Sequence, residues 1–152
     1  MGTLTSVVSG KLVAFDSPPL IYYIEQHSVY FAVADELFNA VRQRLARGLT
    51  SALKLAEVLV KPLRSGRREL ADNYRRFLGS TRGVIVCPIE EAVCERAARL
   101  RAEHGWLRTP DALQVATALE YDAELMVTND DRWRRLREIQ IVVLKDYVGA
   151  SP

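Results

Sequence analysis

The chain has 152 residues, 49% of them hydrophobic and 26% charged, with a formal net charge of +2. This composition excludes a wholly disordered chain, and the length suits a single core, so we expect residues 1–152 to form one domain. No stretch approaches the roughly 20 apolar residues of a membrane span, and the start of the chain lacks the pattern of a secretory signal. We therefore expect a cytoplasmic protein without membrane contact.

The first predicted elements are a strand and two helices. The strand is a short apolar run over residues 11–15 that ends at Asp16, and the proline at position 18 suits the first turn of the helix that follows. A second helix over residues 29–46 spaces its apolar side chains as one stripe, and Gly48 is predicted to end it.

The middle of the chain is predicted to alternate between strands and helices. A strand over residues 49–53 precedes a helix over 53–63, in which Pro62 interrupts the apolar pattern. A strongly basic helix over residues 65–80 follows, and the run at 83–87 is predicted to be the third strand.

The last third of the chain continues the alternation. It is predicted to contain two helices, a strand, a short arginine-rich helix and a final strand, over residues 90–104, 109–121, 124–128, 131–138 and 139–144. Thr109 is predicted to be the N-cap of its helix, with Pro110 in the first turn. Such alternation predicts an α/β fold with three α/β/α layers and a mostly parallel sheet of four to five strands.

Four acidic residues lie where separate elements begin or end. Asp16 and Asp130 follow apolar strands, whereas Glu57 and Asp111 are predicted to lie in the first turns of helices. Ligands bind at the carboxyl ends of the strands in folds of this kind, so these side chains are expected to converge. Carboxylates brought this close cannot all stay ionised without a cation, and oxygen-only ligands favour Mg²⁺ or Mn²⁺ over zinc. The pattern thus predicts metal-assisted phosphodiester hydrolysis.

Each acid also has a structural alternative. Asp111 suits the positive end of a helix dipole, and Asp16 suits a turn. Glu57 lies between apolar neighbours and needs a partner in either case. The two cysteines, Cys87 and Cys94, lack the spacing of a metal site and are predicted to be small buried hydrophobes.

Three segments resemble the acidic motifs of PIN-domain nucleases, particularly the VapC-like toxins of type II toxin-antitoxin systems. They read FDSPPLIYYIE, SALKLAEVLVKPLR and TPDALQVATALEYDAELMVTND, and the resemblance extends from about Leu12 to Val148. It differs at Pro18, where relatives commonly have asparagine, and this puts one supporting hydrogen bond in doubt.

The resemblance implies a PIN-like domain with a site of catalytic and metal-binding residues and a set of supporting residues. The first set is Asp16, Glu57, Asp111 and Asp130, with Asp16 and Asp111 as the principal direct ligands; the second set is Ser17, Thr128, Asn129 and Asp131. Asp131 could instead cap the short helix that follows it.

The resemblance further implies a Mg²⁺-dependent endoribonuclease that acts as a toxin, forms a homodimer and is inhibited by a cognate VapB-like antitoxin. Basic residues between Lys61 and Arg76 could contact an RNA backbone. Tyr22, Tyr23 and Tyr30 could stack on bases, form part of a dimer or antitoxin groove, or belong to the core. Two alternatives stay open: a PIN-domain nuclease that processes RNA or cuts DNA, and a non-catalytic PIN-like protein that binds RNA or a partner.

Overall fold

The computed structural model describes residues 2–149, which fold around one parallel sheet. The strand order is β3-β2-β1-β4-β5. The strands are β1 (Leu12–Phe15), β2 (Arg47–Ser51), β3 (Val84–Cys87), β4 (Leu125–Thr128) and β5 (Gln140–Val143). The chain therefore builds the sheet outward from β1 in one direction, through β2 and β3, and then in the other, through β4 and β5.

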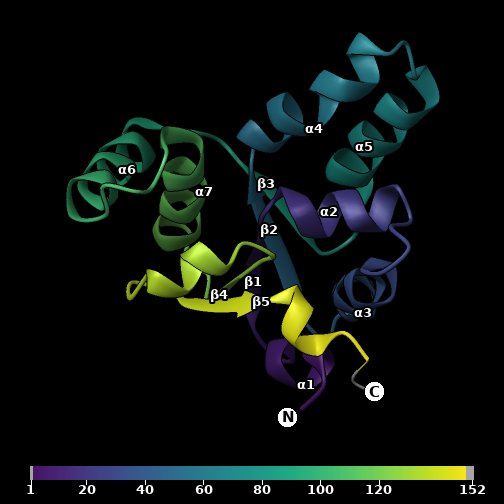
Figure 1. The fold of residues 1–152 in the computed structure, drawn as a ribbon, viewed down its shortest axis with the longest axis horizontal. Helices are drawn as coiled ribbons and strands as arrows, with labels where there is room; N and C mark the ends of the chain where they lie inside the picture. Colours follow the sequence, from purple (N-terminus) through teal and green to yellow (C-terminus); the bar gives the residue numbers. More distant parts are fainter. Residues whose placement is uncertain (1, 150–152) are drawn as a thin grey trace.

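Helices cover both faces of the sheet, which confirms the three-layer α/β/α fold. The α-helices are α1 (Leu4–Val8), α2 (Ser17–Ile24), α3 (Phe31–Arg42), α4 (Leu53–Arg64), α5 (Arg68–Ser80), α6 (Glu91–Glu103) and α7 (Thr109–Glu120). Two 3₁₀ helices follow, η1 (Asp131–Arg135) and η2 (Leu144–Tyr147). In Figure 1, α6 and α7 lie on one side of the sheet and α2 and α3 on the other, while α4 and α5 extend away as a hairpin.

Alternating strand side chains divide the core into two layers. On β1, Val13 and Phe15 face the layer formed with α1, α2, α3 and α5, whereas Leu12 and Ala14 face the layer formed with α6 and α7. This period of two is the ordinary geometry of a strand, and burial on both faces explains why β1 is apolar throughout.

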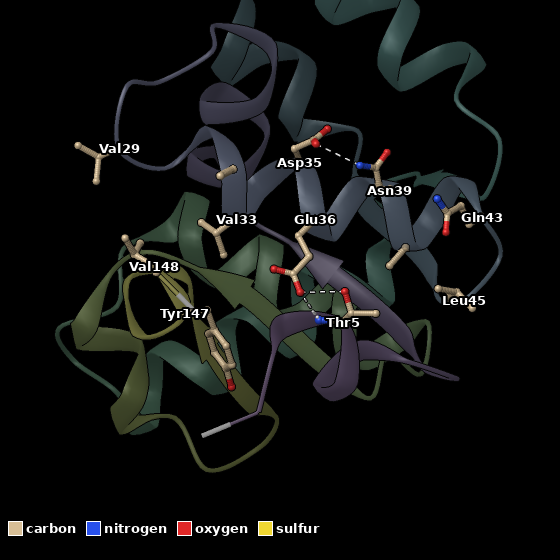
Figure 2. A pocket seen from close by; sticks show the side chains of 13 residues that line it. Thr5, Val29, Val33, Asp35, Glu36, Asn39, Gln43, Leu45, Tyr147 and Val148 are labelled. Carbon is tan, nitrogen blue, oxygen red and sulfur yellow. Dashed lines mark hydrogen bonds between the residues drawn. The ribbon is translucent and has the colours of Figure 1, made fainter. Parts of the chain in front are cut away.

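Two short elements were not predicted from the sequence. Helix α1 is anchored to α3 by Thr5, whose backbone N–H and Oγ1 both donate to Glu36 Oε1 at 2.8 Å (Figure 2). The second is η2. A hollow beside η2 is lined by Tyr147, Val148 and residues of α3. None of the four predicted site acids lines this hollow.

Some predicted boundaries were wrong. Helix α3 ends at Arg42, and Arg44 turns the chain with a φ of 62°, so Gly48 lies inside β2 and does not end the helix. A Cβ at Gly48 would make only ordinary van der Waals contacts, at 3.6 Å from both Phe15 Cε1 and Val41 Cγ1. Glycine's preference for turns therefore misplaced this boundary, because Gly48 is a buried residue of a strand.

Three other local predictions need correction. Thr109 is the first residue of α7, and the N-cap is Arg108, whose side chain makes no capping hydrogen bond. Pro62 lies within α4, which continues to Arg64. Cys87 is buried as expected, but Cys94 is exposed on α6.

None of the helices described between residues 2 and 149 has both the length and the apolar character required to cross a membrane.

Candidate metal and nuclease site

The candidate site lies where the chain changes direction in the sheet. Strands β1 and β4 are neighbours, with Phe15 paired to Val127. Because β1 leads into one half of the sheet and β4 belongs to the other, their carboxyl ends form the switch point at which such folds bind ligands. Asp16 follows β1 and Thr128 ends β4, so two predicted residues meet at this point.

Asp16 is held at the switch point by two hydrogen bonds. It is the N-cap of α2, and its Oδ1 accepts from the backbone N–H of Ser17 at 2.7 Å. Its Oδ2 accepts from Thr128 Oγ1 at 2.9 Å, and the same hydroxyl oxygen accepts from the backbone N–H of Asp130 at 3.2 Å. Thr128 therefore links the two strand-end acids, and the carboxylate of Asp16, a residue that is only 6% exposed, has a fixed direction.

Asp111 lies in the first turn of α7, as predicted. Its pKa is raised to about 6, mainly by burial and in addition by charge repulsion from Asp16, Glu57 and Asp130, against a smaller opposing effect of Arg132. A carboxyl group that feels three other carboxylates shows that the four predicted acids share one electrostatic environment. A cation beside such a group favours its ionised form. An acid that only interacts with a helix dipole does not require a cation.

Glu57 lies in the second turn of α4, one turn further along than predicted, and is half-buried. Its Oε1 accepts from Gln114 Nε2 at 2.7 Å and from Ser17 Oγ at 3.3 Å. These donors supply the partner that a charge among apolar neighbours needs. They also connect α4 to α2 and α7.

Lys54 is a residue of the site that sequence reasoning missed. Its side chain is fully buried, and Nζ donates to Ser17 Oγ at 2.9 Å and to Gln114 Oε1. Nζ also lies 3.7 Å from Asp16 Oδ1 and 3.6 Å from Glu57 Oε1. Burial lowers the pKa of Lys54, and the charges of Asp16 and Glu57 oppose this effect.

The spacing of the helices carried a signal for Lys54 and its partner Gln114. Lys54 precedes Glu57 by three residues, and Gln114 follows Asp111 by three. Residues three apart lie on the same face of a helix, so Lys54 and Gln114 each share a helix face with a predicted acid.

Asp130 belongs to the site but is engaged by an arginine. It is the N-cap of η1, and its Oδ2 accepts from Arg132 at 2.6 Å, with a further 3.1 Å contact from the Arg132 side chain to Oδ1. The hydrogen bonds from Arg132 hold the pKa of Asp130 below its usual value. A metal ion bound by Asp130 would therefore compete with Arg132.

The two remaining predicted residues have structural contacts. Asn129 donates from Nδ2 to Tyr22 at 3.1 Å and accepts from the backbone N–H of Lys145 at 3.0 Å, so it joins β4 to α2 and η2. Asp131 pairs with Arg134 at 3.0 Å and with Lys145. The expectation that Asp131 caps η1 was wrong, because Asp130 fills that position.

The donor set fits a hard divalent ion. The four acids offer only carboxylate oxygens, the ligands that Mg²⁺ and Mn²⁺ prefer. Between residues 2 and 149, the one group with three acidic or histidine ligand atoms within 4.8 Å of one another is elsewhere, at Glu103, His104 and Glu138. There, His104 and Glu138 form a 2.8 Å pair. The four site acids therefore share one region without three of their ligand atoms lying within 4.8 Å of one another, and Lys54 and Arg132 lie among them.

The three tyrosines considered from the sequence differ in their contacts. Tyr23 packs against Phe38 and Phe77 in the core, with ring centroids 5.1 and 5.5 Å apart. Tyr22 stacks on Tyr30 at 4.8 Å, beside Asn129.

Basic side chains near the α4–α5 turn are exposed. They are Lys61, Arg64, Arg67 and Arg68, and within residues 2–149 none of them forms an ion pair. Two arginines of η1 differ, because Arg132 and Arg134 are both paired with acids. The turn between α4 and α5 therefore has positive charge available to an anion, unlike Arg132 and Arg134.

Comparison with known proteins identifies the family of the fold. A family model described as PIN domain matches residues 13–139. No curated protein sequence matches the chain.

Solved structures with a similar fold come from toxin-antitoxin systems. VapBC2 from Rickettsia felis, solved with a DNA fragment from its promoter, is 15% identical with a TM-score of 0.70, and the match covers 87% of this chain and 98% of that chain. A toxin-antitoxin complex from Klebsiella pneumoniae is 21% identical with a TM-score of 0.66, covering 87% and 97%. VapBC-5 from Mycobacterium tuberculosis is 22% identical with a TM-score of 0.55, covering 88% and 98%.

At these identities the solved structures show a shared fold, and the family match spans most of the sequence, including Asp16, Glu57, Asp111 and Asp130. The chain therefore belongs to the PIN domain family.

Proposed function

We propose that this protein is a divalent-metal-dependent endoribonuclease and the toxin of a type II toxin-antitoxin pair. The observation that carries the proposal is the grouping of Asp16, Glu57, Asp111 and Asp130 at the sheet's switch point. The first two acids and Asp130 each raise the pKa of Asp111, and Thr128 links Asp16 to Asp130 by hydrogen bonds. Binding of a cation by such a group offsets the repulsion between its members.

In this proposal Asp16 and Asp111 hold the ion, and Glu57 and Asp130 complete the acidic site. A bound Mg²⁺ or Mn²⁺ supplies an activated water and neutralises charge on the phosphate. Thr128 keeps Asp16 directed at the site through its 2.9 Å hydrogen bond, and Ser17 supports Glu57 at 3.3 Å. Asn129 supports the site indirectly by fixing β4 against α2, and Asp131 by holding η1 through Arg134.

RNA is the proposed substrate. The exposed basic residues of the α4–α5 turn support an anionic polymer, since contacts to phosphates govern affinity for nucleic acid. Tyr22 and Tyr30 lie next to the site residue Asn129 and offer aromatic faces on which unpaired bases can stack.

The toxin role is supported by the fold's occurrence in solved toxin-antitoxin complexes. We accordingly propose a VapB-like antitoxin as the partner, a homodimer as the assembly and the cytoplasm as the location. Exposed apolar side chains on α4, Val60 and Leu63, are 46% and 57% exposed and offer a surface for a protein partner.

The substrate can be tested with matched oligonucleotides. Single-stranded RNA and DNA of identical sequence are incubated with the purified protein and Mg²⁺, Mn²⁺ or EDTA. We expect cleavage of RNA with either metal, none with EDTA, and at least roughly 100-fold slower cleavage of DNA, which corresponds to a transition-state difference of about 2.7 kcal/mol.

Two results would redirect the proposal. Equal rates on RNA and DNA would favour the alternative of a general or DNA-directed nuclease. Binding of RNA without cleavage under every metal condition would favour the non-catalytic alternative.

A further inference from the structure

The amine of Lys54 sits among the site acids with no exposure to solvent. Its Nζ lies within 3.7 Å of Asp16 and 3.6 Å of Glu57, and it hydrogen-bonds Ser17 and Gln114. A lysine is rarely fully buried unless it is paired. A side chain enclosed in this way cannot reach out to a substrate, so its effect must act through the residues around it.

The partners of Lys54 are also the partners of Glu57. Ser17 Oγ accepts from Lys54 and donates to Glu57 Oε1, while Gln114 accepts from Lys54 through Oε1 and donates to Glu57 through Nε2. One oxygen of Glu57 thus faces two hydrogen-bond donors and an ammonium group. This closed network holds Glu57 in place without any metal ion.

The formal charges of the site predict how many divalent ions it binds. Four carboxylates and the two cations paired with them, Lys54 and Arg132, leave a formal charge of −2. One divalent ion balances this charge, whereas a second would make the site positive. Without the lysine the site would be more negative and would attract divalent ions more strongly.

We propose that Lys54 is an internal cation of the acidic site, which keeps Glu57 out of direct metal coordination and limits each site to one divalent ion bound by Asp16 and Asp111. This inference rests on the proposed function, because it requires that the acids bind a metal. It assigns Lys54 as a positioning residue, since its contacts are to site side chains.

The test is a titration of the purified protein with Mn²⁺ alone, followed by electron paramagnetic resonance and by calorimetry. We expect the wild-type protein to bind one Mn²⁺ per chain. In Lys54→Met, which is similar in volume but uncharged, we expect at least roughly ten-fold tighter binding of the first ion and the appearance of a second site with a spin-coupled signal. Lys11→Met is the matched control, because Lys11 directly precedes β1, at the end of the strand opposite to Asp16, and its Mn²⁺ affinity should equal that of the wild type.

A second comparison tests the position of Glu57. If Glu57 does not touch the metal, Glu57→Gln should weaken Mn²⁺ binding by less than roughly ten-fold, while Asp111→Asn should weaken it by at least roughly a hundred-fold. Equal losses in the two variants would contradict the assignment.

The outcomes separate this inference from the proposed function. Absence of Mn²⁺ binding in the wild type would remove the metal site itself and overturn both. Two ions in the wild type, or unchanged affinity in Lys54→Met, would overturn the role of Lys54 alone. If Lys54→Met does not fold, Lys54→Gln keeps a donor for Ser17 while removing the charge, and the same tighter binding is expected.

Discussion

Replacing Asp16 with asparagine is expected to lower metal-dependent RNA cleavage by at least roughly a thousand-fold. A metal ion supplies several kcal/mol of transition-state stabilisation, and each 1.4 kcal/mol is about ten-fold in rate. The fold should survive, because asparagine is as good an N-cap as aspartate and its oxygen can still accept from the N–H of Ser17. Initial rates with Mg²⁺, together with thermal unfolding, measure both effects.

The matched control for this variant is Asp122→Asn. Asp122 follows α7 at the end opposite Asp111, is exposed, and has a φ of 61°, a conformation that asparagine also tolerates. Its rate should stay within about two-fold of the wild type. Full activity in Asp16→Asn would refute the assignment of the site, and the same variant should relieve any growth arrest that expression of the wild-type protein causes.

Replacing Asp111 with asparagine is expected to stabilise the metal-free protein in a pH-dependent way. Burial and the neighbouring carboxylates raise the pKa of Asp111 from 3.8 to about 6. The folded protein therefore binds more protons than the unfolded chain between these values, and the contribution of Asp111 to stability is present below pH 3.8 and lost as pH rises through about 6. The variant has no such loss.

The difference in melting temperature between Asp111→Asn and the wild type, measured in EDTA, should be near zero at about pH 4 and reach a plateau above about pH 6.5. Because Asp111 is half-buried and solvent screens part of the repulsion, we expect a plateau on the order of 1 kcal/mol, equivalent to about 2–4 °C.

Added Mg²⁺ should reverse the order of the two proteins. At a concentration about 100 times its Kd, an ion that binds only the folded state stabilises the wild type by about 2.7 kcal/mol, whereas the variant has lost a ligand. Asp122→Asn should follow the wild type at every pH and with Mg²⁺. A pH-independent difference between Asp111→Asn and the wild type would contradict the shifted pKa, and identical Mg²⁺ responses would contradict a ligand role for Asp111.

The predictions that depended on local patterns were largely confirmed. The apolar runs ending at Asp16 and Thr128 are neighbouring parallel strands, and Pro110 and Asp111 lie in the first turn of α7. Such features follow from the spacing of apolar residues and from proline geometry, which a sequence carries directly. The errors concern ends: α3 ends before Gly48, and α7 begins at Thr109 instead of after it.

By itself, the sequence determined that strands and helices alternate and that acids follow the strands, because period and position along the chain are local properties. Only the tertiary structure decided what surrounds those acids. Lys54 is a polar residue in an amphipathic helix, and its place in the site depends on how α4 packs against α2 and α7, which brings Ser17 and Gln114 to its amine. Nor could the sequence show that Asp130 faces Arg132, since that pair forms only once the chain turns into η1. Contacts between distant segments are fixed by the packing of the whole fold, and they set the charge of this site.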